Sequence, residues 1–217
     1  MMKQLIVYDL DGTLVDTLED ITEAANHMLR QMGAPAMSAR EVRGYVGQGV
    51  HELVRNCLKT EDPARVEEGV RLYRAYYGAH LTDHTRVYPG AKDLLDYFRN
   101  RRQAILTNKS HAPSLDLLAA LDIAGYFSMV IAGDTDYPKK PDPTSILALM
   151  RSAGVAAEAA VFIGDSPIDV ETGRRAGVLS VSILHGFSDE DELRAAGAHV
   201  LVRDFAELLR LARERGW

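Results

Sequence analysis

The 217-residue sequence has little of several features that would point to particular classes of protein. It has one cysteine, Cys57, so an intrachain disulfide is excluded and a reducing, cytoplasmic environment is favoured. It shows no signal-peptide pattern and no apolar run of membrane-spanning length, so we expect no membrane partner. The net charge is −6 and no basic tract stands out, which argues against nucleic acid as a partner.

The sequence does contain enough hydrophobic residues, 47%, to bury the core of one domain with a small satellite. Short apolar runs rich in Val and Ile alternate with amphipathic helical patterns, which predicts a doubly wound α/β fold. The runs are almost continuously apolar, as in strands of a parallel sheet covered on both faces. The predicted strands are Gln4–Leu10, Gln103–Thr107, Met129–Ala132, Ala160–Gly164, Ser180–Leu184 and His199–Val202.

Several helix boundaries can also be predicted from capping patterns. Ser38 with Glu41 matches a capping box, and Asp16 with Glu19 resembles a capped helix start. Two Xaa-Pro pairs and one glycine add further boundaries. They are Asp142–Pro143 and Ser166–Pro167 at helix starts, and Gly177 at a helix end.

One interval breaks the alternation of strands and helices. No strand is predicted between Leu10 and Gln103, and this gap is far longer than an ordinary βα crossover. The patterns there are helical, so we expect a helical cap domain, residues 17–84, inserted into a core domain of residues 1–16 and 85–217. Two short connections, near 13–17 and 84–90, would join the two domains and let the cap hinge as a lid.

Two carboxylates follow the first predicted strand, in the stretch DLDGT. Side chains at positions i and i+2 of a strand share a face, so Asp9 and Asp11 are expected to converge at its carboxyl end. Ligands of open α/β sheets bind at this end. Close carboxylates need a cation or a shared proton, and Gly12 permits a sharp turn beside them. For this stretch alone, the alternative is a polar strand end with ordinary turn residues.

Polar residues also follow the next two strands. Thr107 and Asn108, in LTNKS, offer a hydroxyl, an amide and backbone N–H groups that can hold the oxygens of an anion. Lys139 and Lys140 precede a Pro-Asp-Pro segment that stiffens the chain. Taken singly, these residues also fit a routine turn and two solvated lysines.

The fourth strand ends in FIGDSPIDV, which places Asp165 at the strand end and Asp169 one helical turn later. Carboxylate oxygens of this kind suit Mg²⁺, although acidic residues are also common at helix starts. Acidic oxygens, a hydroxyl, an amide and a cation are thus all expected at one edge of the sheet. That combination suits phosphoryl transfer, in which positioning and charge neutralisation carry most of the catalysis.

The stretches DLDGTLVDT, LTNKS, KKPDP and GDSPIDV resemble, in this order, the four motifs of the haloacid dehalogenase (HAD) superfamily of phosphohydrolases. The resemblance extends over nearly the whole chain, and the helical insertion is similar to the first cap type of that superfamily. TNK, GDTDYPKKPDP and VGQGV resemble the phosphoglycolate phosphatase subgroup. The fold implied is a Rossmann-like core with a small helical cap.

The resemblance implies a role for each motif residue. Asp9 would be the nucleophile that forms an aspartyl-phosphate, and Asp11 the general acid and then the general base. Lys140 would neutralise charge. The residues implied in phosphate binding are Thr107, Asn108 and Gly12. The ligands implied for Mg²⁺ are Asp9, Asp11 through its backbone carbonyl, and Asp165, with Asp169 supporting the metal.

Other activities remain open within and beyond the superfamily. A pyrophosphatase, a nucleotidase and a β-phosphoglucomutase-like enzyme are alternatives. Dehalogenation expels halide and needs no proton, so Asp11 favours phosphate esters. Phosphonate cleavage needs a cap lysine for a Schiff base. The candidate is Lys59, and its position at a helix end argues against this activity. An alternative of another class is a receiver-like signalling domain that keeps its phospho-aspartate, but such domains carry no inserted cap.

The expected partner is a small phosphorylated metabolite, and its identity depends on the cap. The segment RGYVGQGVHELVR is expected to close over the site. Arg43 and His51, both in this segment, are candidates for contacting a carboxylate of the substrate, and simple coverage of the cap surface is the alternative. The sequence is compatible with a monomer or a homodimer.

Overall fold

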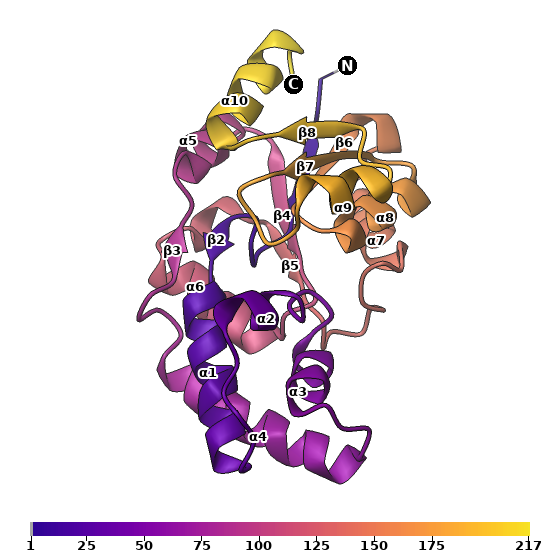
Figure 1. The fold of residues 1–217 in the computed structure, drawn as a ribbon. Helices are drawn as coiled ribbons and strands as arrows, with labels where there is room; N and C mark the ends of the chain where they lie inside the picture. Colours follow the sequence, from indigo (N-terminus) through magenta and orange to yellow (C-terminus); the bar gives the residue numbers. More distant parts are fainter. Residues whose placement is uncertain (1) are drawn as a thin grey trace.

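The computed structural model describes residues 2–217 and contains a six-stranded parallel sheet (Figure 1). The strand order is β5-β4-β1-β6-β7-β8, and each neighbouring pair is parallel. The strands are β1 (Leu5–Tyr8), β4 (Arg102–Leu106), β5 (Met129–Ile131), β6 (Ala160–Gly164), β7 (Leu179–Ile183) and β8 (Val200–Val202). A strand is present in each predicted interval, so the predicted α/β class is confirmed.

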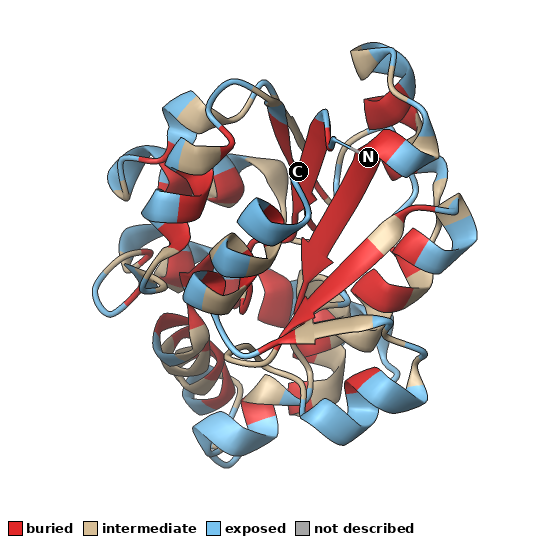
Figure 2. Cartoon of the chain, turned by 90° about the horizontal axis from the view of Figure 1, so that it is seen from above, coloured by how far each residue is buried: buried red, intermediate tan, exposed pale blue. Residues whose placement is uncertain are grey.

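Helices cover both faces of this sheet, which accounts for the continuous apolarity of its strands. Along β1, Ile6 and Tyr8 join one hydrophobic cluster, whereas Leu5 and Val7 join another on the opposite face. The first cluster includes side chains of α5 (Ala91–Tyr97), α6 (His111–Ala120) and α10 (Phe205–Glu214). The second includes side chains of α7 (Thr144–Ala153), which packs beside α8 (Pro167–Ala176), and α8 is followed by α9 (Glu190–Ala195). Figure 2 shows the buried strands between the two helical layers.

The insertion between β1 and β4 is helical, as predicted, and lies at one end of the core in Figure 1. Its helices are α1 (Leu18–Gln31), α2 (Ala39–Arg43), α3 (Val50–Leu58) and α4 (Pro63–Ala79). Buried side chains such as Met28, Val54 and Tyr73 hold them together. Cys57 is buried among them, and burial raises the pKa of its thiol to about 11.

Two very short strands join the insertion to the core. Strands β2 (Val15–Asp16) and β3 (Arg86–Val87) pair antiparallel, so the entry and exit of the insertion lie side by side. The prediction of no strand between Leu10 and Gln103 is wrong here, because strands of this length leave no apolar run to detect. We keep residues 17–84 as a proposed cap and residues 1–16 and 85–217 as a proposed core, with Met1 outside the described residues.

The capping box at Ser38 before α2 is confirmed, as are the helix start at Ser166–Pro167 before α8 and the helix end at Gly177, which has the left-handed conformation. Ser166 and Asp169 also form a capping box, which was not predicted. The predicted start at Asp16 is wrong, since Asp16 lies in β2 and Thr17 is the N-cap of α1. Helix α7 has Pro143 as its N-cap, one residue later than predicted. Among residues 2–217, no helix has the length and apolarity needed to cross a bilayer.

Candidate active site

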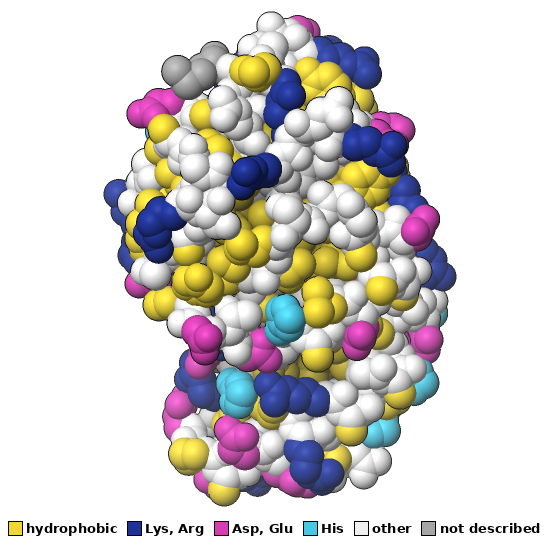
Figure 3. Space-filling model, turned by 180° about the vertical axis from the view of Figure 1, so that it is seen from behind, with side chains coloured by type: hydrophobic (Ala, Val, Ile, Leu, Met, Phe, Trp, Pro, Cys, Tyr) yellow, Lys and Arg dark blue, Asp and Glu magenta, His cyan; other side chains and the backbone are white. Residues whose placement is uncertain are grey.

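A cavity of about 420 Å³ lies where the carboxyl ends of β1 and β4 face the cap. The cap contributes mainly apolar and aromatic side chains, among them Ile21, Leu53 and Tyr73, whereas the sheet edge contributes Asp9 and Thr107. Figure 3 shows hydrophobic side chains gathered across the middle of one face, at the level where cap and core meet. The cavity therefore combines a polar floor with an apolar roof.

Asp9 lies on the floor, directly after β1 ends at Tyr8. One of its carboxylate oxygens, Oδ1, accepts hydrogen bonds from the Leu10 N–H at 2.7 Å and is 2.9 Å from Lys140 Nζ. The other oxygen, Oδ2, has no hydrogen-bond donor among the described residues. Burial and the nearby Asp169 carboxylate raise the pKa of Asp9 to about 7, against the opposing effect of Lys140. Asp9 is thus held by one oxygen and presents the other.

Lys140 joins two acidic residues in the interior. Its Nζ lies 2.6 Å from Asp169 Oδ1, and its side chain is only 2% exposed, whereas Lys139 is exposed. Burial alone would lower the pKa of Lys140, but the carboxylates of Asp169 and Asp9 outweigh this effect and raise it. The second oxygen of Asp169 accepts hydrogen bonds from Ser166 N and Oγ within the capping box of α8. Helix α8 therefore fixes Asp169, and Asp169 positions the ammonium group.

Asp165, at the end of β6, completes a cluster of three buried carboxylates. Asp9, Asp165 and Asp169 each offer an oxygen, and these three atoms lie within 4.8 Å of one another. Asp165 accepts hydrogen bonds from Thr13 Oγ1 at 2.6 Å and from the Phe187 N–H at 2.7 Å. Burial and the carboxylates of Asp169 and Asp9 raise its pKa to about 8. Hard oxygen donors that repel one another in this way fit a small divalent cation.

Gly12 is required beside this cluster for two reasons. Its φ of +80° is strained for any residue with a side chain, and a Cβ at this position would collide with the Asp165 carboxylate. Gly12 therefore has a steric role that the sequence did not reveal, and its role in phosphate binding stays a prediction.

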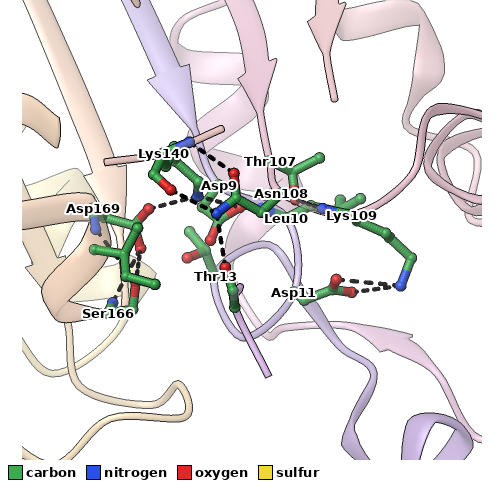
Figure 4. A network of polar contacts seen from close by, with 12 residues as sticks. Asp9, Leu10, Asp11, Thr13, Thr107, Asn108, Lys109, Lys140, Ser166 and Asp169 are labelled. Carbon is green, nitrogen blue, oxygen red and sulfur yellow. Dashed lines mark hydrogen bonds and ion pairs between the residues drawn. The ribbon is translucent and has the colours of Figure 1, made fainter. Parts of the chain in front are cut away.

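Asp11 points away from Asp9 and Asp169, towards Lys109 (Figure 4). Lys109 Nζ lies 3.1 and 3.2 Å from its two carboxylate oxygens, and Thr17 Oγ1 donates a hydrogen bond of 2.9 Å. The expectation that Asp9 and Asp11 converge as strand neighbours is wrong, because β1 ends at Tyr8 and the i, i+2 rule no longer applies. Both residues nevertheless line the same cavity.

Thr107 and Asn108 also line the cavity, but their side chains differ in function. Thr107 Oγ1 accepts the Lys109 N–H, which leaves its hydroxyl hydrogen free to donate. The Asn108 amide is fully engaged with backbone groups: it donates to the Gly47 and Lys140 carbonyls and accepts the Lys140 N–H. Asn108 therefore ties β4 to the lysine loop and to the cap, while its own backbone N–H finds no acceptor among the described residues.

The two cap residues predicted to meet a substrate carboxylate do not line the cavity. Arg43 contacts the Phe187 carbonyl and the Asp189 carboxylate of the core. His51 lies 3.3 Å from Glu67 within the cap. Arg43 thus joins α2 to the segment that follows β7, whereas His51 of α3 pairs with α4.

Sequence reasoning missed several residues that support the site. Thr13 holds Asp165, Thr17 holds Asp11, and Ser166 holds Asp169. Tyr77 of α4 contacts Lys109 at 2.7 Å. The DGT and SPID patterns contained a signal for Thr13 and Ser166, since hydroxyls next to carboxylates commonly donate to them. No local pattern signals Tyr77, because its hydrogen-bond partner Lys109 lies 32 residues later in the chain.

Residues 6–183 of the chain match the protein family described as haloacid dehalogenase-like hydrolase. The chain belongs to this family. It is 35% identical to a phosphoglycolate phosphatase of Pseudomonas putida over 96% of this chain and 79% of that protein. It is 34% identical to a phosphoglycolate phosphatase of Chromobacterium violaceum over 94% of this chain and 93% of that protein.

Among solved structures, a protein of Haemophilus somnus described as a predicted phosphoglycolate phosphatase is similar to this chain, with a TM-score of 0.92 and 26% identity. The alignment covers 98% of this chain and 99% of that one. The predicted membership of the superfamily is thus confirmed, and this hydrolase is a phosphoric monoester hydrolase that acts on small phosphorylated substrates. Such hydrolases generally use a divalent metal, and the three buried carboxylates are the matching cluster.

Proposed function

We propose that this hydrolase cleaves 2-phosphoglycolate to glycolate and phosphate through an aspartyl-phosphate on Asp9, with Mg²⁺ as its metal. The observation that carries the proposal is the state of Asp9. One of its oxygens is held by Leu10 and Lys140, and the other faces no donor among the described residues. A carboxylate held in this way is preorganised as a nucleophile.

In the first step, the free oxygen of Asp9 attacks phosphorus, and the bond between phosphorus and the ester oxygen breaks. The departing oxygen takes a proton from Asp11. Lys140, the Thr107 hydroxyl and the backbone N–H of Asn108 are available to neutralise or hold the phosphoryl oxygens. Preorganised donors of this kind each contribute on the order of a hundredfold to rate.

In the second step, a water molecule attacks the phosphorus of the aspartyl-phosphate and gives a proton to Asp11. The bond between phosphorus and the Asp9 oxygen breaks, which releases phosphate and regenerates the carboxylate. Asp11 serves as acid and then as base. It pairs with Lys109, whereas Asp9 pairs with Lys140, so the two carboxylates do not share one cation. Two carboxylates with different surroundings and different roles are a recurrent arrangement in hydrolases.

The residues that would hold Mg²⁺ are Asp9, Asp165 and the backbone carbonyl of Asp11, with Asp169 supporting them. Their buried oxygens fit a hard cation, because burial and then repulsion from neighbouring carboxylates raise the pKa of Asp9 and of Asp165, and a bound cation relieves both effects. The bound ion would supply charge neutralisation for the attacking carboxylate and the phosphoryl group.

The assignment of 2-phosphoglycolate is supported by the names of the similar proteins and by the cavity. The Pseudomonas putida and Chromobacterium violaceum relatives are both phosphoglycolate phosphatases. The cavity of about 420 Å³ is bounded by the cap, which limits the size of the leaving group.

A screen of phosphate esters in the presence of Mg²⁺ tests the proposal. We expect 2-phosphoglycolate to have one of the highest kcat/KM values and hexose phosphates to have much lower ones. A clear preference for pyrophosphate, nucleotides or hexose phosphates would contradict the substrate assignment. A stable phosphoprotein without sustained phosphate release would instead indicate a receiver-like signalling role.

A further inference from the structure

Two cations line the cavity among the described residues, and they differ in burial. Lys109 follows β4 and has a side chain only 8% exposed, whereas Arg74 on α4 is exposed. Lys140 lies apart, bound to Asp9 and Asp169. Lys109 is therefore the buried cation on the side of the cavity that faces the cap.

The contacts of Lys109 leave part of its hydrogen-bonding capacity available. An ammonium group has three N–H donors and no acceptor. The Asp11 carboxylate accepts at 3.1 and 3.2 Å, and the Tyr77 hydroxyl accepts at 2.7 Å. If the carboxylate takes one N–H between its two oxygens, a third N–H remains for a ligand.

Tyr77 provides a second donor at the same place. Because lysine can only donate, the Tyr77 oxygen must accept the hydrogen bond, and its own O–H hydrogen is left over. That hydrogen has no acceptor among the described residues, although Tyr77 is only 4% exposed and lines the cavity. An unused donor in a buried position costs free energy unless a ligand or water accepts from it.

Tyr77 and Lys109 come from different domains, so their contact forms only when α4 lies over β4. Arg74, one turn before Tyr77 on α4, adds positive charge at the cavity edge. Three groups that attract anions thus line the cavity that also contains Asp9, the proposed nucleophile. Phosphate chemistry takes place at Asp9, so the group near Lys109 would be part of the alcohol that leaves.

We propose that Lys109 and Tyr77 bind the carboxylate of the leaving group and so select phosphate esters of small hydroxy acids. The proposal rests on the proposed function, and it assigns to Lys109 and Tyr77 the contact that the sequence assigned to Arg43 or His51. Recognition across the two domains makes the carboxylate a bridge between the core and the cap. Esters without a carboxylate lack this bridge.

The test compares two esters of similar size, 2-phosphoglycolate and ethyl phosphate, in the wild-type protein and in Lys109→Met and Tyr77→Phe. The measured quantity is the ratio of kcat/KM for the two esters. We expect Lys109→Met to lower this ratio about tenfold to a hundredfold, the range for a lost hydrogen bond to a charged group. Tyr77→Phe, which keeps the ring in place, should lower it several-fold.

Matched controls are Lys92→Met and Tyr76→Phe. Lys92 is an exposed lysine of α5, and Tyr76 lies beside Tyr77 on α4, but neither lines the cavity. Both variants should keep the wild-type ratio. Thermal unfolding of all four variants distinguishes folded proteins from unfolded ones, and the Tyr77→Phe result stands if Lys109→Met does not fold.

The outcomes separate this inference from the proposed function. An equal loss for both esters in Lys109→Met and Tyr77→Phe would overturn the inference, since these residues would then act only through Asp11 or the fold. An unchanged preference for 2-phosphoglycolate in both variants would overturn it as well, with the proposed substrate intact. No preference in the wild-type protein would overturn the proposed substrate and the inference together.

Discussion

At the scale of single residues, two carboxylates only two positions apart in the sequence have different partners. Asp9 is buried against Lys140, whereas Asp11 pairs with Lys109 on the cap side of the cavity. The separation arises because β1 ends before both residues and Gly12 turns the chain at a positive φ. The pentapeptide DLDGT thus gives its two carboxylates separate surroundings, as the proposed roles of nucleophile and proton carrier require.

The two adjacent lysines provide a test at this scale. We expect Lys140→Ala to lower kcat by about a hundredfold or more, because it removes a positioned cation beside the nucleophile. Lys139→Ala should change kcat little, since Lys139 is exposed and forms no ion pair with a described residue. Steady-state kinetics on both variants, with thermal unfolding as a check of folding, measures this. Equal losses would mean that neither lysine, or the wrong one, has been assigned to catalysis.

The identity of the motif residues could be predicted from the sequence, but most of their partners could not. Parallel strands end at one edge of a sheet, so residues that follow them are expected to lie near one another. Four motif residues follow strands in this way: Asp9, Thr107, Lys140 and Asp165. The hydrogen bond from Thr13 to Asp165 spans 152 residues. Contacts at such separations depend on how the elements pack, and no local pattern encodes them.

At the scale of elements, helix α8 does more than cover the sheet. Its capping box holds Asp169 at the first turn, and Asp169 in turn holds Lys140. This helix start could be predicted from Ser166 and Pro167. The start of α1 could not be predicted, because Asp16 lies in the two-residue strand β2 and Thr17 is the N-cap residue of the helix.

Removing the N-cap side chain of helix α8 should lower the stability of the folded protein. Ser166→Ala should lower the free energy of unfolding by about 1 kcal/mol, the usual effect of losing an N-cap side chain. The control is Ser110→Ala, because Ser110 is the N-cap residue of α6 but forms no side-chain capping bond. Urea denaturation measures both. A loss in Ser110→Ala as large as that in Ser166→Ala would contradict this account of the helix start.

At the scale of the whole molecule, the proposed cap and the proposed core both line one cavity, and the proposed metal site is the carboxylate cluster of the core. Three buried carboxylates lie close together there with one lysine between two of them, so the folded protein gains from a divalent cation. A ligand that binds only the folded state raises its stability by mass action.

Chelation with EDTA should therefore abolish turnover, and added Mg²⁺ should restore it. Mg²⁺ should also raise the Tm of the metal-free protein, measured by scanning calorimetry. In Asp165→Asn this rise should be lost, whereas Asp116→Asn, which alters an exposed carboxylate of the same cavity, should keep it. Full activity in excess EDTA after removal of bound metal would refute the metal assignment.

The central claim is that Asp9 forms a phosphoenzyme whose hydrolysis depends on Asp11. The most direct measurement is rapid quenching of the protein with a nitrophenyl phosphate, followed by mass spectrometry of the peptide that contains Asp9. In Asp11→Asn, the activated leaving group departs without a proton, but water lacks its base, so aspartyl-phosphate should accumulate on Asp9 while turnover falls by roughly 10²–10⁴-fold. In Asp9→Asn no adduct should form. An adduct on Asp11 in the wild-type protein would reverse the two roles, and steady hydrolysis with no adduct on either residue in any of the three proteins would contradict the covalent mechanism.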